Sequence, residues 1–183
     1  MPNLYQFRDR VKAYRREKLL KAARFLYENG FTSNRVSILG LFFGVASAFF
    51  LFSHHAVYVL LILLNIILDN FDGTIARKIE KKKGNGWLVD VVCDRTVTIS
   101  LLTAFYLHTA TPYALALIAL LPLTNFFFVY GKLFLKKDIK MIHLDSVLQI
   151  LFIFSWFELG IYFLLTTTTL NFFFMLFQRI RLR

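Results

Sequence analysis

Long apolar stretches alternate with short polar connections along the whole chain. A helix needs about 20 mostly apolar residues to cross the hydrocarbon core of a bilayer. The pattern therefore predicts an all-α polytopic membrane protein with six transmembrane helices. The last two stretches are short for a full crossing, so a re-entrant helical pair is the alternative there. The six stretches cover residues 34–52, 56 into the polar segment at 69–72, 86–107, 112–133, 144–157 and 161–177.

The N-terminal segment has a different character. Residues 4–28 mix aliphatic and aromatic side chains with many cations, and eight Lys and Arg residues fall within the first 24 positions. This mixture is typical of an amphipathic basic helix that lies on a membrane surface; a solvated charged arm is the alternative. We therefore expect two parts, an amphipathic juxtamembrane helix at 1–30 and a transmembrane domain at 31–183.

Composition and charge support a membrane protein and indicate its orientation. Hydrophobic residues make up 57% of the 183 residues, and Phe alone occurs 22 times. The net charge is +11, and the Lys and Arg residues cluster at the two termini and at 77–83 and 132–140. With six crossings all four clusters lie on one side, which the positive-inside rule makes the cytosolic side. The expected polyanion is then the lipid surface and not nucleic acid, and both termini are expected in the cytosol.

Four aspartates gather around the second connection. Asp69 and Asp72 are three residues apart, and Asp90 and Asp94 are four apart, so each pair shares one face of a helix. The short connection makes these two helices antiparallel neighbours, so all four carboxylates can meet at one depth. Such a group of anions near hydrocarbon requires a positive partner. Oxygen ligands alone suit Mg²⁺, Mn²⁺ or Ca²⁺ and argue against zinc. A cation or proton transporter that uses these aspartates is an alternative of another class.

Small residues and one cation accompany the aspartates. The small residues Gly73, Ala76 and Gly86 lie at helical spacing from the charged ones, with Gly73 four residues before Arg77 and Gly86 four before Asp90. A groove lined by Gly and Ala admits a flat ligand close to the backbone, and an arginine can bind phosphate through two hydrogen bonds. Close packing of membrane helices is the alternative explanation for the small residues.

The full order of these residues resembles the signature of the CDP-alcohol phosphatidyltransferase family at eight defined positions. The order is Asp69-x2-Asp72-Gly73-x2-Ala76-Arg77-x8-Gly86-x3-Asp90-x3-Asp94.

The resemblance implies a reaction and assigns roles. Family members transfer a substituted phosphoryl group from a CDP-alcohol to an acceptor hydroxyl and release CMP in phospholipid biosynthesis. It implies that two divalent cations, Mg²⁺ or Mn²⁺, are held by Asp69, Asp72, Asp90 and Asp94, and that Asp94 is also the general base. It places CDP against Asp69 and against the four residues Gly73, Ala76, Arg77 and Gly86. A homodimer is expected from the family alone.

The acceptor is indicated less directly. Lys132, Lys136, Lys137 and Lys140 lie at and beyond the end of the fourth helix on the expected cytosolic side, and Asn34 begins the first helix there. This charge favours a phosphate-bearing acceptor, such as glycerol 3-phosphate or inositol phosphate, with CDP-diacylglycerol or another lipid CDP-alcohol as donor. Ordinary positive-inside lysine is the alternative for each of them. Within the family, the alternative is a soluble CDP-alcohol donor with a lipid or polyol-phosphate acceptor.

Overall fold

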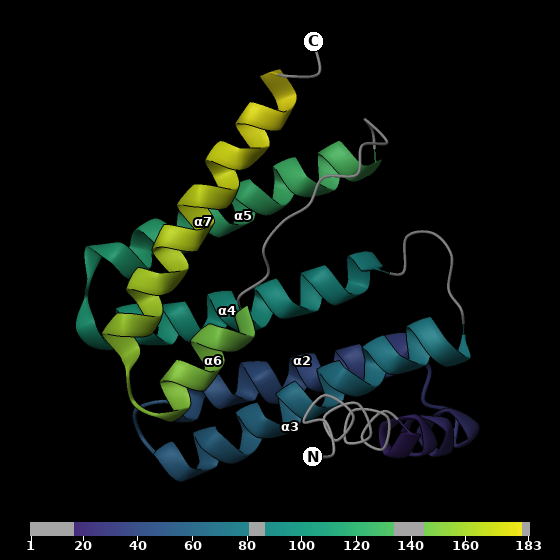
Figure 1. The fold of residues 1–183 in the computed structure, drawn as a ribbon. Coiled ribbons are helices and arrows are strands. Elements are labelled where there is room, and N and C mark those ends of the chain that lie inside the picture. The colour runs from purple at the N-terminus through teal and green to yellow at the C-terminus, as the bar shows by residue number, and fades with distance from the viewer. Residues whose placement is uncertain (1–16, 81–86, 134–144, 181–183) are drawn as a thin grey trace, which may run out of the picture.

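The computed structural model describes residues 17–80, 87–133 and 145–180, and every regular element in these ranges is a helix (Figure 1). The all-α prediction is confirmed for this part of the chain. After a helix over residues 17–28, the elements are α2 (Ser33–Phe50), α3 (His55–Thr74), the π-helix η1 (Ile75–Ile79), α4 (Trp87–Thr109), α5 (Pro112–Leu133), α6 (Asp145–Ile153) and α7 (Phe157–Ile180).

Three helices are long and apolar enough to cross a membrane. They are α2, α3 with its continuation to Ile79, and α5 up to Tyr130. Large apolar side chains point outward from the helices, among them Phe49 on α2 and Leu107 on α4, which are 79% and 78% exposed. Such a surface suits contact with lipid and not with water. Membrane crossing is thus supported, and the predicted number of six spans is not confirmed.

The last two helices differ from the predicted boundaries. The described part of α6 has nine residues, about 14 Å at 1.5 Å per residue, which is less than half of a bilayer core. α6 ends at Ile153 and α7 begins at Phe157, so the turn lies a few residues earlier than the predicted gap between 157 and 161. The reason is local: Ser155 adopts a left-handed backbone (φ 59°), and the Trp156 N–H reaches back to the Leu151 carbonyl at 3.0 Å, which ends α6.

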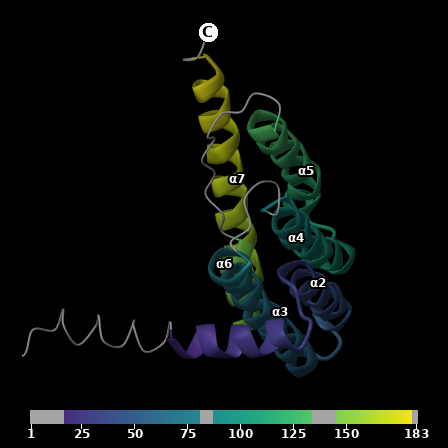
Figure 2. The ribbon, with the colours of Figure 1, turned by 90° about the vertical axis from the view of Figure 1, so that its right-hand side faces the viewer.

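α2 packs against both α3 and α4 through its small residues. Gly40 and Gly44 lie on this buried face. A Cβ built on Gly44 would lie only 2.4 Å from Cγ2 of Val97 on α4, so the two helices approach as closely as a glycine permits. α2 lies between α3 and α4, α5 follows α4 on its other side, and α7 crosses α5 (Figures 1 and 2).

The helix over residues 17–28 crosses the end of this row (Figure 2). Ala23 is fully buried in a small cluster with Val36 of α2 and Ile75 of η1. The helix ends at Glu28, and the φ of +86° at Gly30 permits the Phe31 N–H to bond the Leu26 carbonyl at 3.0 Å. The predicted surface helix therefore packs, in its described part, against the end of α3 that carries the aspartates.

Candidate active site

The aspartates meet where α3 ends and α4 begins. Each of Asp69, Asp72 and Asp90 offers a carboxylate oxygen, and these three atoms lie within 4.8 Å of one another. Asp72 is buried, with 5% of its surface exposed, whereas Asp69 and Asp90 are half-buried. The sequence predicted that α3 and α4 pack as antiparallel neighbours. In the structure each of them packs extensively on α2 and little on the other, and the two aspartate pairs meet where both helices converge on α2.

Asp94 lies one helical turn beyond Asp90 and lines a small cavity beside the three carboxylates. Asp69 and Asp72 line the same cavity, and its remaining walls come from α2, α3 and α4: Ser37, Gly40, Leu41, Asn65, Cys93 and Val97. The cavity is therefore bordered by carboxylates from both motif helices and by small or polar residues of α2. Cys93 is buried at this wall.

Two serines of α2 bind acidic side chains, one in the last turn of α3 and one directly after η1. The Ser37 hydroxyl donates to Oδ2 of Asp72 at 2.6 Å. One turn earlier, the Ser33 hydroxyl and N–H donate to the Glu80 carboxylate at 2.6 and 3.1 Å. Thr32 stands at the N-cap of α2 but makes no capping bond through its side chain, so Glu80 supplies the acceptor, and the negative charge, that this helix end requires.

These contacts were not predicted from the sequence. A signal was present nonetheless. Ser33 and Ser37 are four residues apart and fall on the same face as Gly40 and Gly44, the face that had to meet the aspartate helices. Polar side chains on a buried face of a membrane helix require partners.

The donor set fits a hard divalent cation. Oδ1 of Asp72 is buried and has no hydrogen-bond partner among the residues that the structure describes. A buried carboxylate oxygen is costly to leave unpaired, and two further carboxylates face the same point. Oxygen atoms held this closely are the ligands that Mg²⁺ and Mn²⁺ take, because a cation offsets their mutual repulsion.

Arg77 lies in a π-helical turn. After Thr74 the α-helix becomes η1, and the Glu80 N–H bonds the Ile75 carbonyl at 2.9 Å, five residues back. Such insertions are frequent at functional sites. The Arg77 side chain is exposed, and its guanidinium lies directly over Gly73: a Cβ built there would be 2.8 Å from Nη2. Gly73 thus makes room for the arginine head group.

Replacing Gly73 by alanine is expected to displace this guanidinium and leave the fold intact. The added Cβ would contact only the flexible end of Arg77, 2.8 Å from Nη2 and 3.1 Å from Nη1, so the arginine can swing away. If Arg77 binds a donor phosphate, losing its charge-assisted hydrogen bonds should raise the KM for the CDP-alcohol about tenfold, with little change in thermal stability.

The control for this variant is Arg77→Ala, alone and combined with Gly73→Ala. Two changes that remove one contact are not additive, so the double variant should show the KM of Arg77→Ala. An unchanged KM in Gly73→Ala would contradict the role of the Gly73–Arg77 contact.

Of the other predicted site residues, the structure describes some and leaves others outside the described part of the chain. Ala76 is half-buried within η1, and Asn34 is exposed in the first turn of α2. Lys132 lies in the last turn of α5 with its ammonium 5.6 Å from the centre of the Phe128 ring. The remaining predicted residues lie outside the described part of the chain: Gly86, Lys136, Lys137 and Lys140.

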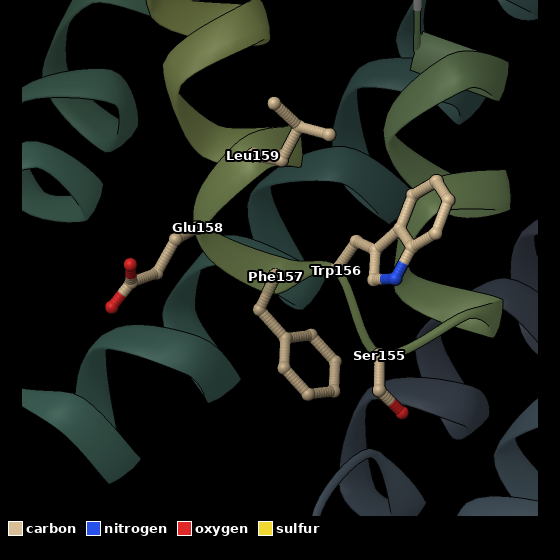
Figure 3. Close-up of a pocket in the computed structure, with 5 residues that line it drawn as sticks. All are labelled: Ser155, Trp156, Phe157, Glu158 and Leu159. Carbon is tan, nitrogen blue, oxygen red and sulfur yellow. The ribbon is translucent and has the colours of Figure 1, made fainter.

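A separate depression lies at the turn between α6 and α7 (Figure 3). Ser155, Trp156, Phe157, Glu158 and Leu159 line it. The ring of Phe157 lies 5.3 Å from that of Phe52, which follows α2, so this depression belongs to the end of the bundle opposite the aspartates. A single exposed carboxylate among apolar groups gives it no evident chemistry.

Comparisons with known sequences agree with the motif. The family model for CDP-alcohol phosphatidyltransferase matches residues 31–178. An uncharacterized protein of Aquifex aeolicus (strain VF5) is 30% identical over 103 residues, which are 56% of this chain and 53% of that protein. The chain thus matches about half the length of this curated relative.

The fold also matches solved structures. The crystal structure of Mycobacterium tuberculosis phosphatidylinositol phosphate synthase (PgsA1) with CDP-DAG bound aligns with a TM-score of 0.62 and 18% identity, covering 84% of this chain and 88% of that one. The apo form gives 0.61 and 16%, covering 82% and 90%. At this identity the likeness establishes the fold alone. The family model spans the motif and most of the chain, which confirms the resemblance seen in the sequence: this chain belongs to the CDP-alcohol phosphatidyltransferase family.

Proposed function

We propose that this protein is a membrane phosphotransferase of phospholipid biosynthesis. It transfers the substituted phosphoryl group of CDP-diacylglycerol, or of another lipid CDP-alcohol, to a hydroxyl of a polar acceptor. The observation that supports this best is the convergence of Asp69, Asp72 and Asp90 within 4.8 Å, beside a cavity that Asp94 lines. A diphosphate donor needs both a site for cations and a base for the attacking hydroxyl.

In this proposal each motif residue has a distinct task. Asp69, Asp72, Asp90 and Asp94 would hold two Mg²⁺ or Mn²⁺ ions, which supply positive charge as the diphosphate bond breaks. Asp94 takes the proton of the acceptor hydroxyl as its oxygen attacks the phosphorus of the transferred group, and CMP leaves with the electrons of the broken P–O bond. Arg77 contacts a donor phosphate, and Gly73, Ala76 and Gly86, together with Asp69, border the cytidine.

The favoured acceptor carries a phosphate, as glycerol 3-phosphate and inositol phosphate do. Lys132, Lys136, Lys137, Lys140 and Asn34 are the residues proposed to bind it. The structural neighbour is named a phosphatidylinositol phosphate synthase, which supports testing inositol phosphate first. A soluble CDP-alcohol that donates to a lipid or polyol phosphate remains the alternative within the family.

We also propose the cellular arrangement that the charge pattern favours. The amphipathic segment 1–30 lies on the membrane and the domain 31–183 crosses it six times, with both termini and the active site facing the cytosol and two copies forming a homodimer. A transporter is the less favoured class, because its cation site would be expected near the bilayer midplane. Asp69 and Asp72 instead lie in the last two turns of α3, next to the lysine-rich connection.

The test is CMP release by the purified full chain in detergent with CDP-diacylglycerol and Mg²⁺. Acceptors are offered one at a time: glycerol 3-phosphate, inositol 1-phosphate, inositol and serine. We expect CMP with one phosphate-bearing acceptor, and a rate about a hundredfold lower in Asp94→Asn, the lower end of what a general base contributes.

Two outcomes would count against this reading. If no acceptor gives CMP release with CDP-diacylglycerol, but a soluble CDP-alcohol does give it, then the donor is the soluble molecule and the acceptor is the lipid or polyol phosphate. No cleavage of any CDP-alcohol by a folded, Mn²⁺-binding protein would contradict the transferase and favour a cation pathway.

A further inference from the structure

We propose that Ser37 of α2 is a positioning residue for the cation site. It lies outside the aspartate motif and orients the carboxylate of Asp72 so that one oxygen stays available to the cation. The inference rests on the proposed function, because it assumes that Asp72 binds a cation. It adds a third helix to a site that the motif builds from α3 and α4.

The contact between the two side chains is short and shielded from solvent. The Ser37 hydroxyl lies 2.6 Å from Oδ2 of Asp72, and the two residues are 8% and 5% exposed. The same hydroxyl lies 3.0 Å from the Ser33 carbonyl, but it has a single proton to donate. The shorter distance and the charge of the carboxylate favour donation to Asp72.

This hydrogen bond gives the two carboxylate oxygens of Asp72 different surroundings. Oδ2 is occupied by Ser37, whereas Oδ1 is buried without a partner among the described residues. A hydrogen bond to one oxygen hinders rotation of the carboxylate about its Cβ–Cγ bond. Ser37 thereby fixes the plane of the Asp72 carboxylate and leaves its second oxygen available to a cation held with Asp69 and Asp90. Groups that orient a metal ligand in this way typically change metal affinity by about 10- to 100-fold when removed.

α2 also provides a matched control. Ser47 is fully buried on the same helix, and its hydroxyl donates to the Gly44 carbonyl at 2.6 Å. Ser47→Ala and Ser37→Ala therefore remove the same group from the same helix, and only the second removes a partner of a carboxylate. Ser37→Thr keeps the hydroxyl and serves as the conservative variant.

The experiment measures Mn²⁺ binding by electron paramagnetic resonance on the purified full chain in detergent, without any CDP-alcohol. We expect Ser37→Ala to weaken Mn²⁺ binding about tenfold, and Ser37→Thr and Ser47→Ala to bind as the wild type does. Asp72→Asn is included as the loss-of-ligand reference and is expected to bind more weakly than Ser37→Ala.

The outcomes separate this inference from the proposed function. Wild-type binding by Ser37→Ala with a loss in Asp72→Asn would overturn the role of Ser37 and leave the cation site standing. An equal loss in Ser47→Ala, or a failure of Ser37→Thr to bind, would overturn it as well. Wild-type binding by Asp72→Asn would overturn the cation site at Asp72 and with it the inference. Should Ser37→Ala not fold, Ser37→Cys replaces it, since its thiol is a similar size and a weak donor.

Discussion

Exchange of Asp72 for asparagine is expected to lower CMP release about a thousandfold. The change keeps the shape of the side chain and removes its charge, at the most deeply buried of the three clustered carboxylates. A cation that acts on a phosphoryl oxygen contributes several kcal/mol to the transition state, and three factors of ten correspond to about 4 kcal/mol. The measurement is the rate of CMP release at saturating Mg²⁺.

The same exchange should stabilise the protein when no cation is present. The oxygens of Asp69, Asp72 and Asp90 lie within 4.8 Å of one another, so their charges repel in a setting poorly screened by water. In EDTA, Asp72→Asn should therefore unfold at a higher temperature than the wild type. Adding Mg²⁺ should stabilise the wild type by mass action and stabilise the variant less.

The control is Glu158→Gln, the same carboxylate-to-amide exchange at the exposed depression beyond α6. It should leave both CMP release and the response to Mg²⁺ unchanged. A lower unfolding temperature for Asp72→Asn in EDTA would contradict the repulsion, and an undiminished rate would contradict the role of Asp72 in the reaction.

The sequence predicted the aspartate cluster because local rules suffice for it. Three- and four-residue spacing puts each pair on one face of a helix. The direct packing expected between α3 and α4 was wrong, because both helices pack on α2. The all-α class and the surface helix follow from periodicity and charge in the same way. These features depend on residues that are near one another in the chain.

What the sequence did not predict depends on distant pairs or on backbone detail. The bonds from Ser33 to Glu80 and from Ser37 to Asp72 join residues 47 and 35 positions apart, and a serine in an apolar helix can equally well bond its own backbone, as Ser47 does. The π-helical turn at Ile75–Ile79 adds one residue to a turn that reads as ordinary helix. The early turn at Ser155 depends on a left-handed residue that is not a glycine.

Replacement of Gly44 by alanine is expected to be the most disruptive single-methyl change in the described bundle. The added Cβ would lie 2.4 and 2.8 Å from the two methyl groups of Val97, and 3.1 Å from Nδ2 of Asn65. Val97 is itself 1% exposed, so it has little room to move and α2 must shift away from α4. Overpacking of this kind costs about 1–3 kcal/mol, which should appear as a lower unfolding temperature in detergent.

The displacement of α2 from α4 should also lower the reaction rate, because Val97 and Asp94 line the same cavity one helical turn apart. A shift of about 1 Å in a catalytic group can cost on the order of a hundredfold in rate. We therefore expect Gly44→Ala to lower CMP release even in protein that remains folded. Gly40→Ala is the matched control for stability, because its Cβ would meet Leu68 at an ordinary 3.5 Å and should leave the unfolding temperature nearly unchanged.

Truncation of Val97 tests whether a clash with this side chain causes the loss of stability in Gly44→Ala. In Gly44→Ala the second change Val97→Ala removes the two methyl groups that the new Cβ meets, so the double variant should be more stable than the sum of the single effects predicts. Coupling between contacting residues is typically about 0.5–3 kcal/mol. Additive losses in this cycle would mean that α2 and α4 do not meet at Gly44 and Val97 as closely as the structure places them.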